Sequence, residues 1–451
     1  MSVHALDVWD ADTRIGLLGW DSVSDTFSFA YSSAWLGSDS AYPISPHFPL
    51  QSGATIASAT IRRFIENLLP EGRTLDIAAS THRLSRNNLF GLIRELGRES
   101  TGALSFTIAG QAAPTQPSTM REVTHAELAS RIAERARVPF SVWDGRVRLS
   151  IAGHQDKLAA YLDGDRIHLV DGALASTHIL KPEPADPRVP CLVANEHYCM
   201  RLGAALGIPT APVRILRVPD PVLVVERFDR IRRAGTVRRI HIIDACQALD
   251  LPASFKYEHN FGNGRDVHHI RDGIGFERLF SVLSLVGNPA RATQALLRWS
   301  LLQYVIGNAD AHGKNVSFFS EPHALTLAPF YDMVSTVRYP ALDTELAMAF
   351  GDEFRLDAVS PFALADFASR IGVPRRALVR EMRRMARTVA QQAPLLADSA
   401  EYLDEERDMV TAIAGFARNQ AQKLLAMADP TLAVDPGLLD SGPADAPSTA
   451  R

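Results

Sequence analysis

The chain has few cysteines, little net charge and no long apolar run. Its 451 residues include three cysteines, at 191, 199 and 246, which form no CxxC pair and no zinc-ligand spacing. This odd set argues against a disulfide framework. The formal net charge of −4 gives no overall attraction to nucleic acid. No apolar segment approaches the length of a membrane span, and the N-terminal "MSVHALDVWDAD" has acids where a signal peptide needs a basic start. We therefore expect a cytoplasmic protein without membrane contact.

The composition that remains is that of a globular protein, with 46% hydrophobic and 22% charged residues. "TRIGLLGW" and "DTFSFAY" alternate apolar and polar residues around "DSVSD", which predicts a hairpin. "ATIRRFIENLLP" predicts an amphipathic helix that ends at Pro70, and "NLFGLIRELG" predicts another that stops at Gly97. The Pro-rich stretch 110–119 is interpreted as a linker or surface loop.

The next segments predict strands first and helices later. Thr124 and Glu127 have the spacing of a helix-starting capping box. "DKLAAYL" and "RIHLV" around "DGD" predict a second hairpin, and "STHILKP" and "PVLVVERFDR" predict further strands. From about residue 275 the pattern is mostly helical, with closing helices near 361–395 and 402–428.

This order predicts an α+β protein with two lobes and an additional N-terminal subdomain. The expected units are an N-terminal β/α subdomain (1–110), a linker and helix (111–148), a β-rich lobe (149–230), a helical lobe (231–430) and a disordered tail (431–451).

The stretch "GNADAHGKN" (307–315) is the main candidate for chemistry. Asp310 and Asn315 have the D-x-x-x-x-N spacing of a protein-kinase catalytic loop. There an aspartate accepts the proton of a hydroxyl, and an asparagine one turn later holds a magnesium ion. His312 and Lys314 lie between them, and Lys314 could balance the charge of a transferred phosphoryl group. Taken alone, the motif favours a polar turn after a helix, because this spacing occurs by chance in many proteins.

Three residues elsewhere favour the chemical interpretation. Asp332, in "PFYDMVS", follows the aromatic Tyr331 on what we expect to be a short strand, and could be a second magnesium ligand. Lys181 ends an apolar strand, where a buried lysine needs an anionic partner such as a phosphate; it could instead extend to solvent. Glu196 could pair with Lys181, although the simpler interpretation is an acid near a helix N-terminus.

Two further stretches could contact a nucleotide. In "ERFDR" the Glu226 carbonyl and the Phe228 amide could hold adenine, and Asp229 could reach the ribose; a strand end with solvated charges is the alternative. In "LSIAGHQDKL" the small and polar residues Ala152, Gly153, His154 and Gln155 could direct backbone amides toward phosphates. Ser150 beside them is a hydroxyl that a kinase could modify in itself, or an ordinary loop serine.

In this order the motifs resemble the HipA toxin kinases of bacterial toxin–antitoxin systems. The resemblance rests on "SIAGHQDKL", "THILKP", "NEHYCM", "VVERFDR", "SFKYE", "GNADAHGKN" and "PFYDMVS", together with the N-terminal stretches "FPLQSG", "FIENLLPEG" and "LIRELGRESTGALSF". It extends over roughly residues 3–430.

The resemblance implies a serine/threonine protein kinase with a distant kinase-like fold. On matching positions Asp310 is the catalytic base, Asn315 and Asp332 bind Mg²⁺, and Lys181 contacts ATP phosphates. It also implies a phosphate loop at 151–156 and inhibitory autophosphorylation at Ser150, where the added charge would displace that loop.

The partners implied are a HipB-like helix-turn-helix antitoxin, DNA only through the complex with it, and a protein substrate of the translation machinery. An aminoacyl-tRNA synthetase such as glutamyl-tRNA synthetase is the expected type of substrate.

Two alternatives stay open. The chain could be a non-catalytic kinase-fold module that acts in an antitoxin–DNA repressor complex. The arginines at 375, 376, 380, 383, 384 and 387 would then contact DNA phosphates, although a solvated helix face is the favoured interpretation. The chain could also be a kinase acting on a small molecule.

Overall fold

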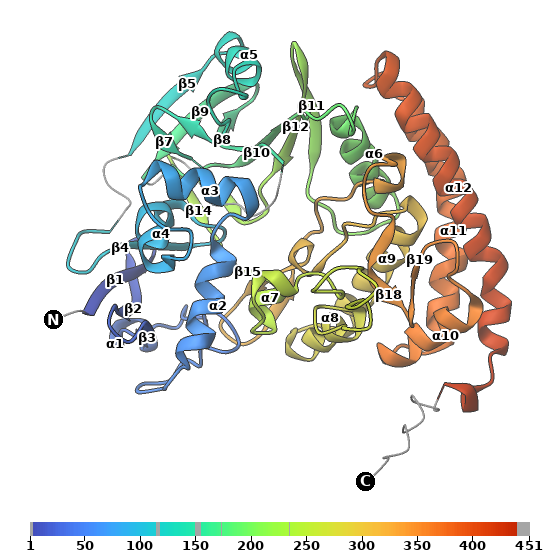
Figure 1. The fold of residues 1–451 in the computed structure, drawn as a ribbon, viewed down its shortest axis with the longest axis horizontal. Helices are drawn as coiled ribbons and strands as arrows, with labels where there is room; N and C mark the ends of the chain where they lie inside the picture. Colours follow the sequence, from blue (N-terminus) through green and yellow to red (C-terminus); the bar gives the residue numbers. More distant parts are fainter. Residues whose placement is uncertain (1–2, 114–117, 149–154, 173, 234, 440–451) are drawn as a thin grey trace.

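The computed structural model describes residues 3–113, 118–148, 155–172, 174–233 and 235–439 (Figure 1). Predictions for Ser150, Ala152, Gly153 and His154 fall outside these ranges. The expected mixture of sheets and helices is confirmed. The disordered tail was predicted to begin too early, because α12 (Asp404–Ala433) continues past residue 431 and a short 3-10 helix follows it at Pro436–Leu438.

The N-terminal subdomain is an antiparallel sheet covered by helices. Its strand order is β3-β2-β1-β4. The bounds are β1 Val3–Asp10, β2 Thr13–Asp21, β3 Thr26–Tyr31 and β4 Leu104–Ile108, so the predicted hairpin is present as β2 and β3. Helices α2 (Ser58–Leu68), α3 (Gly72–Thr81) and α4 (Leu89–Leu96) follow. As the periodicity predicts, α2 buries Ile61, Phe64, Ile65 and Leu68 and ends before Pro70.

A second, six-stranded sheet has the order β11-β12-β10-β8-β9-β5. The bounds are β5 Thr119–Val123, β8 Leu158–Asp163, β9 Arg166–Asp171, β10 His178–Pro182, β11 Val213–Val218 and β12 Asp220–Glu226. The predicted hairpin over β8 and β9 is confirmed. Helix α6 (Leu192–Ala205) connects β10 to β11 and is buried along most of its length.

The segment 111–148 is not the separate linker that we expected. Its strand β5 pairs with β9 at the edge of the six-stranded sheet, and α5 (His125–Ala133) packs Leu128 and Ile132 into the same apolar core. Only half of the expected capping box forms: the Thr124 hydroxyl accepts from the Glu127 amide, whereas the Glu127 carboxylate pairs with Arg121. The period-two pattern of β5 is too short to predict from sequence.

The C-terminal lobe is mainly helical and has small sheets at its edge. Its long helices are α9 (Pro289–Ile306), α10 (Pro361–Arg370), α11 (Arg375–Ala397) and α12, with α11 and α12 side by side (Figure 1). Strands β15 (Ile242–Asp244), β16 (Ser317–Ser320) and β17 (Leu325–Leu327) form one sheet, and β18 (Glu345–Phe350) pairs with β19 (Glu353–Arg355). No helix in the described ranges is long and apolar enough to cross a membrane.

Helix α9 brings the chain to the candidate catalytic stretch. Almost all of its second half is buried, so its end is fixed by the core. It stops at Gly307, whose φ of 64° favours glycine, and a Cβ there would lie 2.7 Å from Val337. The chain therefore leaves the helix sharply, and residues 308–315 start from a fixed point.

Two buried arginines and the partly buried Arg239 attach the N-terminal subdomain to the rest of the molecule. Arg239 donates to four backbone carbonyls of the segment 98–104, those of Arg98, Ser100, Gly102 and Leu104. Arg230 donates to the Gly102 carbonyl at 3.0 Å and to Asp229, whose carboxylate also accepts the Gly102 amide at 3.0 Å. Arg227 completes this cluster with two bonds to Asp229.

We expect Asp229→Ala to lower the free energy of unfolding by about 3–5 kcal/mol, because it leaves two buried guanidinium groups without their carboxylate. Urea unfolding followed by tryptophan fluorescence measures the change. Asp186→Ala is the matched control, since Asp186 forms the same type of pair with Arg188 on the surface and its loss should leave the midpoint unchanged. Equal midpoints for wild type and Asp229→Ala would contradict the role of this cluster.

Candidate active site

The stretch after α9 folds into a short loop that fixes Asp310 and Asn315 against each other. The Asp310 amide donates to the Asn308 side chain at 3.0 Å, and the Asn315 Nδ2 donates to the Asp310 carbonyl at 2.9 Å. A 3-10 helix at Gly313–Asn315 closes the loop. Asp310 is exposed and Asn315 is buried. The backbone of Asp310 is thus fixed by two hydrogen bonds while the residue stays exposed, as a general base for an incoming hydroxyl requires.

Lys181 lies at the centre of a buried ion cluster. Its Nζ is 2.7 Å from Glu196 Oε1 and 2.7 Å from Asp332 Oδ1. Lys181 belongs to β10 and Glu196 to α6, where it lies beyond the first turn. The pairing of Lys181 with Glu196, which the sequence left open, is therefore present, and the simpler interpretation of Glu196 as a helix-terminal acid is wrong.

Asp332 does not lie on a strand, contrary to expectation. It has a φ of 59° in irregular chain after the isolated bridge between Thr210 and Phe330. This left-handed conformation is uncommon for a residue other than glycine, and Asp tolerates it better than most. It turns the carboxylate toward Lys181 while 37% of the side chain stays exposed. The side chain is accordingly both paired and accessible.

Burial and charge act in opposite directions on this cluster. Burial alone would lower the pKa of Lys181, but Asp332 and Glu196 outweigh it and raise the pKa. Burial would raise the pKa of Asp332, and Lys181 and Lys157 outweigh it and lower the pKa. A second ammonium group thus lies near the first: burial, with Lys181 next in importance, lowers the pKa of Lys157 to about 8. The cluster therefore contains the ammonium groups of Lys181 and Lys157 and the carboxyl groups of Glu196 and Asp332, of which Asp332 is partly exposed.

The chain after β12 supplies the aromatic side of the site. Phe228 follows Glu226 and packs its ring 5.7 Å from that of Tyr331. The Tyr331 hydroxyl donates to the Lys314 carbonyl at 2.7 Å. The Glu226 amide donates to the Pro212 carbonyl, and among the described residues no backbone carbonyl accepts the Phe228 amide. Gln155, the described end of the predicted phosphate loop, lies 3.5 Å from the Pro182 carbonyl, directly after Lys181.

Two predicted site residues have structural partners instead. Asp229 is 3% exposed, and both of its oxygens are bonded to Arg227, Arg230 and Gly102, so it does not offer a free carboxylate to a ribose. The Lys314 ammonium group is 2.5 Å from Asp244 and 2.8 Å from Asn67 Oδ1, so it is not free to balance phosphoryl charge. His312 is buried, and its ring packs 4.9 Å from that of Tyr257.

Tyr257 is the functional-site residue that sequence reasoning missed. Its hydroxyl donates to Asp310 Oδ1, although the two residues are 53 positions apart. The stretch "SFKYE" contributed to the family resemblance without a role for any of its residues, and no local pattern indicates the contact. Lys157 was likewise quoted within a motif and given no role.

Comparison with known proteins shows two matching family models. The HipA N-terminal domain matches residues 6–107, and the HipA-like C-terminal domain matches residues 149–393. The chain belongs to the HipA family of kinases. The serine/threonine-protein kinase toxin HipA of Shewanella oneidensis is 39% identical over 93% of this chain and 94% of its own length. The putative kinase Y4mE of Sinorhizobium fredii is 33% identical over 93% of this chain and 99% of its own.

A solved structure agrees with this assignment. Shewanella oneidensis HipA, in a complex with HipB and operator DNA, superposes with a TM-score of 0.86 at 37% identity, covering 95% of this chain and 100% of that one. The expected two-lobed, kinase-like α+β fold is thereby confirmed. Lys181, Asp310, Asn315 and Asp332 all lie within the segment matched by the C-terminal family model.

We expect Lys181→Met to make stability fall more steeply as pH rises. Burial raises the pKa of Glu196 to about 7 even with Lys181 beside it, and the variant removes that cation, so the pKa rises further. The folded state then keeps a proton that the unfolded chain, with a glutamate pKa of about 4.3, has released. Stability is therefore lost as the pH rises toward the folded-state pKa.

The measurement is Tm between about pH 6 and pH 9 for wild type and variant. The double variant Lys181→Met/Glu196→Gln is the control, because it has no carboxyl to titrate at this position and should lose the steeper slope. Parallel curves of Tm against pH for wild type and Lys181→Met would show that the pKa of Glu196 does not depend on Lys181.

Proposed function

We propose that the chain is a serine/threonine protein kinase toxin that transfers the γ-phosphate of ATP to a protein of the translation machinery, such as an aminoacyl-tRNA synthetase of the glutamyl type. The observation that carries the proposal is the meeting of Lys181, Glu196 and Asp332 from three separate segments. Such a cluster gives a lysine that is fixed, charged and adjacent to an accessible carboxylate. The membership in the HipA family supports the same conclusion.

The residues present fit a nucleotide and Mg²⁺. Asn315 donates its Nδ2 to the protein, which leaves its Oδ1 for a metal ion, and Asp332 adds a partly exposed carboxylate. These are the oxygen donors that Mg²⁺ prefers, and it usually takes few protein ligands beside phosphates and water. This agrees with the finding that the described residues contain no cluster of three His, Cys, Asp or Glu side chains placed for a metal.

In the proposed mechanism Asp310 orients the substrate hydroxyl and accepts its proton. Asn315 and Asp332 would hold Mg²⁺, which would neutralise charge on the phosphates. Lys181 contacts the phosphates, with Gln155 at the end of the 151–156 loop nearby. The Glu226 carbonyl and the Phe228 amide hold adenine, with Tyr331 behind Phe228. Ser150 is the proposed autophosphorylation site, where an added phosphate would prevent the adjoining loop from covering the nucleotide.

We expect Asp310→Ala to lose phosphoryl transfer by about 10²-fold or more while nucleotide affinity stays within a few-fold of wild type, because the base acts on the hydroxyl and not on ATP. Intact mass after incubation with Mg²⁺ and ATP measures transfer, and calorimetry measures binding. One added phosphate on wild type, absent from Asp310→Ala and from Ser150→Ala, is the expected result.

The starting mass of purified wild type is the control, since a protein already phosphorylated would add nothing. Unmodified wild-type protein that stays unmodified with Mg²⁺ and ATP would contradict autophosphorylation. Transfer at the wild-type rate by Asp310→Ala would contradict the base assignment.

The second candidate role is repression in a complex with a HipB-like antitoxin and DNA. The observation in its favour is one face of α11, where Arg376, Arg380 and Arg387 are exposed and have no carboxylate partner among the described residues. In contrast, Arg383 pairs with Asp429 and Arg384 with Glu381. The solved Shewanella complex contains HipB and operator DNA. In a similar complex of this chain, the exposed arginines of α11 would contact DNA phosphates.

We expect the triple variant Arg376→Ala/Arg380→Ala/Arg387→Ala to weaken operator binding by the complex with antitoxin, because up to three phosphate contacts are lost. The slope of log affinity against log salt should become shallower by up to about 0.9 for each arginine that touches a phosphate. Fluorescence anisotropy with labelled operator over a salt series measures it. Arg355→Ala, on the exposed pair with Asp357, is the control; an unchanged slope in the triple variant would exclude this face.

A further inference from the structure

Glu71 reaches from the N-terminal subdomain into the base of the catalytic loop. It lies in the turn between α2 and α3, directly after Pro70, and its side chain is 16% exposed. Its Oε2 is 2.7 Å from Lys256 Nζ, and its Oε1 is 3.9 Å from Lys314 Nζ. Burial would raise the pKa of Glu71, but Lys314 and Lys256 outweigh it and lower the pKa. One carboxylate thus faces two buried ammonium groups of the other lobe.

The first of these ammonium groups belongs to the catalytic loop itself. Lys314 lies between Asp310 and Asn315, and it also bonds to Asn67 Oδ1 at 2.8 Å. Asn67 is fixed in turn, because its Nδ2 donates to the Arg63 and Leu251 carbonyls at 2.9 Å each. The last turn of α2 and the residue after Pro70 therefore both hold the loop from the same side.

The second ammonium group belongs to the segment that touches the catalytic base. The Lys256 carbonyl accepts the amide of Gly313, inside the loop, at 2.9 Å. Its ammonium group is 5.4 Å from the ring centre of Tyr257. Tyr257 then donates its hydroxyl to Asp310. The position of Lys256 thus affects both the backbone of the loop and the only described side chain that donates a hydrogen bond to the Asp310 carboxylate.

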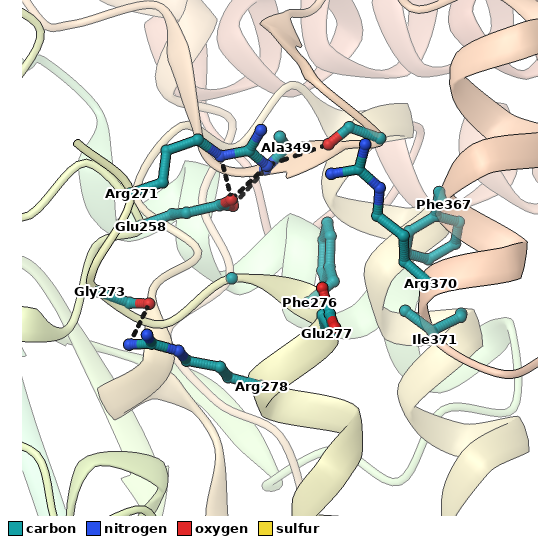
Figure 2. Close-up of a pocket in the computed structure, with 12 residues that line it drawn as sticks. Glu258, Arg271, Gly273, Phe276, Glu277, Arg278, Ala349, Phe367, Arg370 and Ile371 are labelled. Carbon is teal, nitrogen blue, oxygen red and sulfur yellow. Dashed lines mark hydrogen bonds and ion pairs between the residues drawn. The ribbon is translucent and has the colours of Figure 1, made fainter. Parts of the chain in front are cut away.

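The other side of Tyr257 is fixed within the catalytic lobe. Glu258 accepts from Arg271 Nε at 2.7 Å and from the Ala349 amide at 2.8 Å. Figure 2 shows the Arg271 side chain lying across Glu258. The Arg271 guanidinium group also donates to the Gly351 carbonyl at 3.1 Å. Glu258 is thus held from within the catalytic lobe, whereas Lys256 is held from the N-terminal subdomain by its ion pair with Glu71.

We propose that Glu71 is a positioning residue for phosphoryl transfer: it places the catalytic loop and Tyr257 through Lys256 and Lys314. The inference rests on the proposed kinase function. Among the described residues, the hydrogen bonds and ion pairs of the Glu71 carboxylate go to Lys256 and Lys314 and not to Asp332 or Lys181, so Glu71 lies outside the proposed nucleotide site. The catalytic loop and Tyr257 are accordingly in position only when the N-terminal subdomain is docked. Loss of Glu71 therefore affects the phosphoryl-transfer step.

The test is a double-mutant cycle of Glu71→Gln and Lys256→Gln in the full chain, with autophosphorylation followed by intact mass. Each single variant should lower the transfer rate by about 10- to 100-fold, as expected for small misplacement of a catalytic group, while the KM for ATP stays within about twofold. The double variant should be no slower than the slower single variant, because both changes break the same contact. Glu71→Asp should recover part of the rate.

Glu95→Gln is the matched control, since Glu95 lies in the same subdomain and pairs with the partly exposed Arg94; it should transfer at the wild-type rate. Calorimetric ATP-binding stoichiometry gives the folded fraction of each variant and separates misfolding from misplacement. A rate for Glu71→Gln within twofold of wild type, or strictly additive losses in the double variant, would overturn the inference. Inactive wild-type protein would instead count against the proposed function, so the two failures are distinguishable.

Discussion

The ion cluster around Lys181 is the constraint on which the active site depends. An ammonium group in the interior is strongly unfavourable unless carboxylates surround it. Lys181 is 9% exposed and has two, from segments that lie 15 and 151 positions away in the chain. The sheet, helix α6 and the chain after Phe330 must therefore come together before this charge can be buried. The proposed nucleotide site is therefore assembled when these three parts of the chain pack together during folding.

Buried charges also explain how the N-terminal subdomain is attached. Arg230, Arg239 and Asp229 bind the segment 98–104 close to the chain after β12, and Lys256 and Lys314 bind Asn67 and Glu71 below the catalytic loop. The two attachments are directional hydrogen bonds with charged partners, which fix orientation more closely than apolar contact does. The subdomain is therefore attached both beside the proposed adenine side and beside the proposed transfer side of the site.

Local patterns in the sequence predicted the elements but not the partners of the charged residues. The hairpins and α2 follow from periodicity, because the alternation of a strand and the apolar face of a helix are both set by residues close together in the sequence. Asp229 and Lys314 were assigned to ligand and phosphate because their motifs are polar and close to Asp310 or Phe228. The Lys314 ammonium group is occupied by Asn67 and Asp244, which lie 247 and 70 positions away in the chain. Asp229 is bonded to its chain neighbours Arg227 and Arg230, but its burial also depends on the Gly102 amide, 127 positions away. The same limit hid Tyr257, whose only signal is its contact across 53 positions.

Lys181 and Lys314 are both buried, but their partners differ in exposure to solvent. Both Lys181 and Lys314 lie in motifs of the family resemblance, and both have a carboxylate partner within 3 Å. The partner of Lys181 is Asp332, whose side chain is 37% exposed, whereas Lys314 is enclosed by Asp244 at 12% and by Asn67 at 6%. An incoming phosphate can approach Lys181 from the solvent side of Asp332, and it would have to open the interface between subdomains to reach Lys314. The exposure of the partner thus distinguishes the two lysines, and it supports the proposed role of Lys181 at the nucleotide and of Lys314 within the loop.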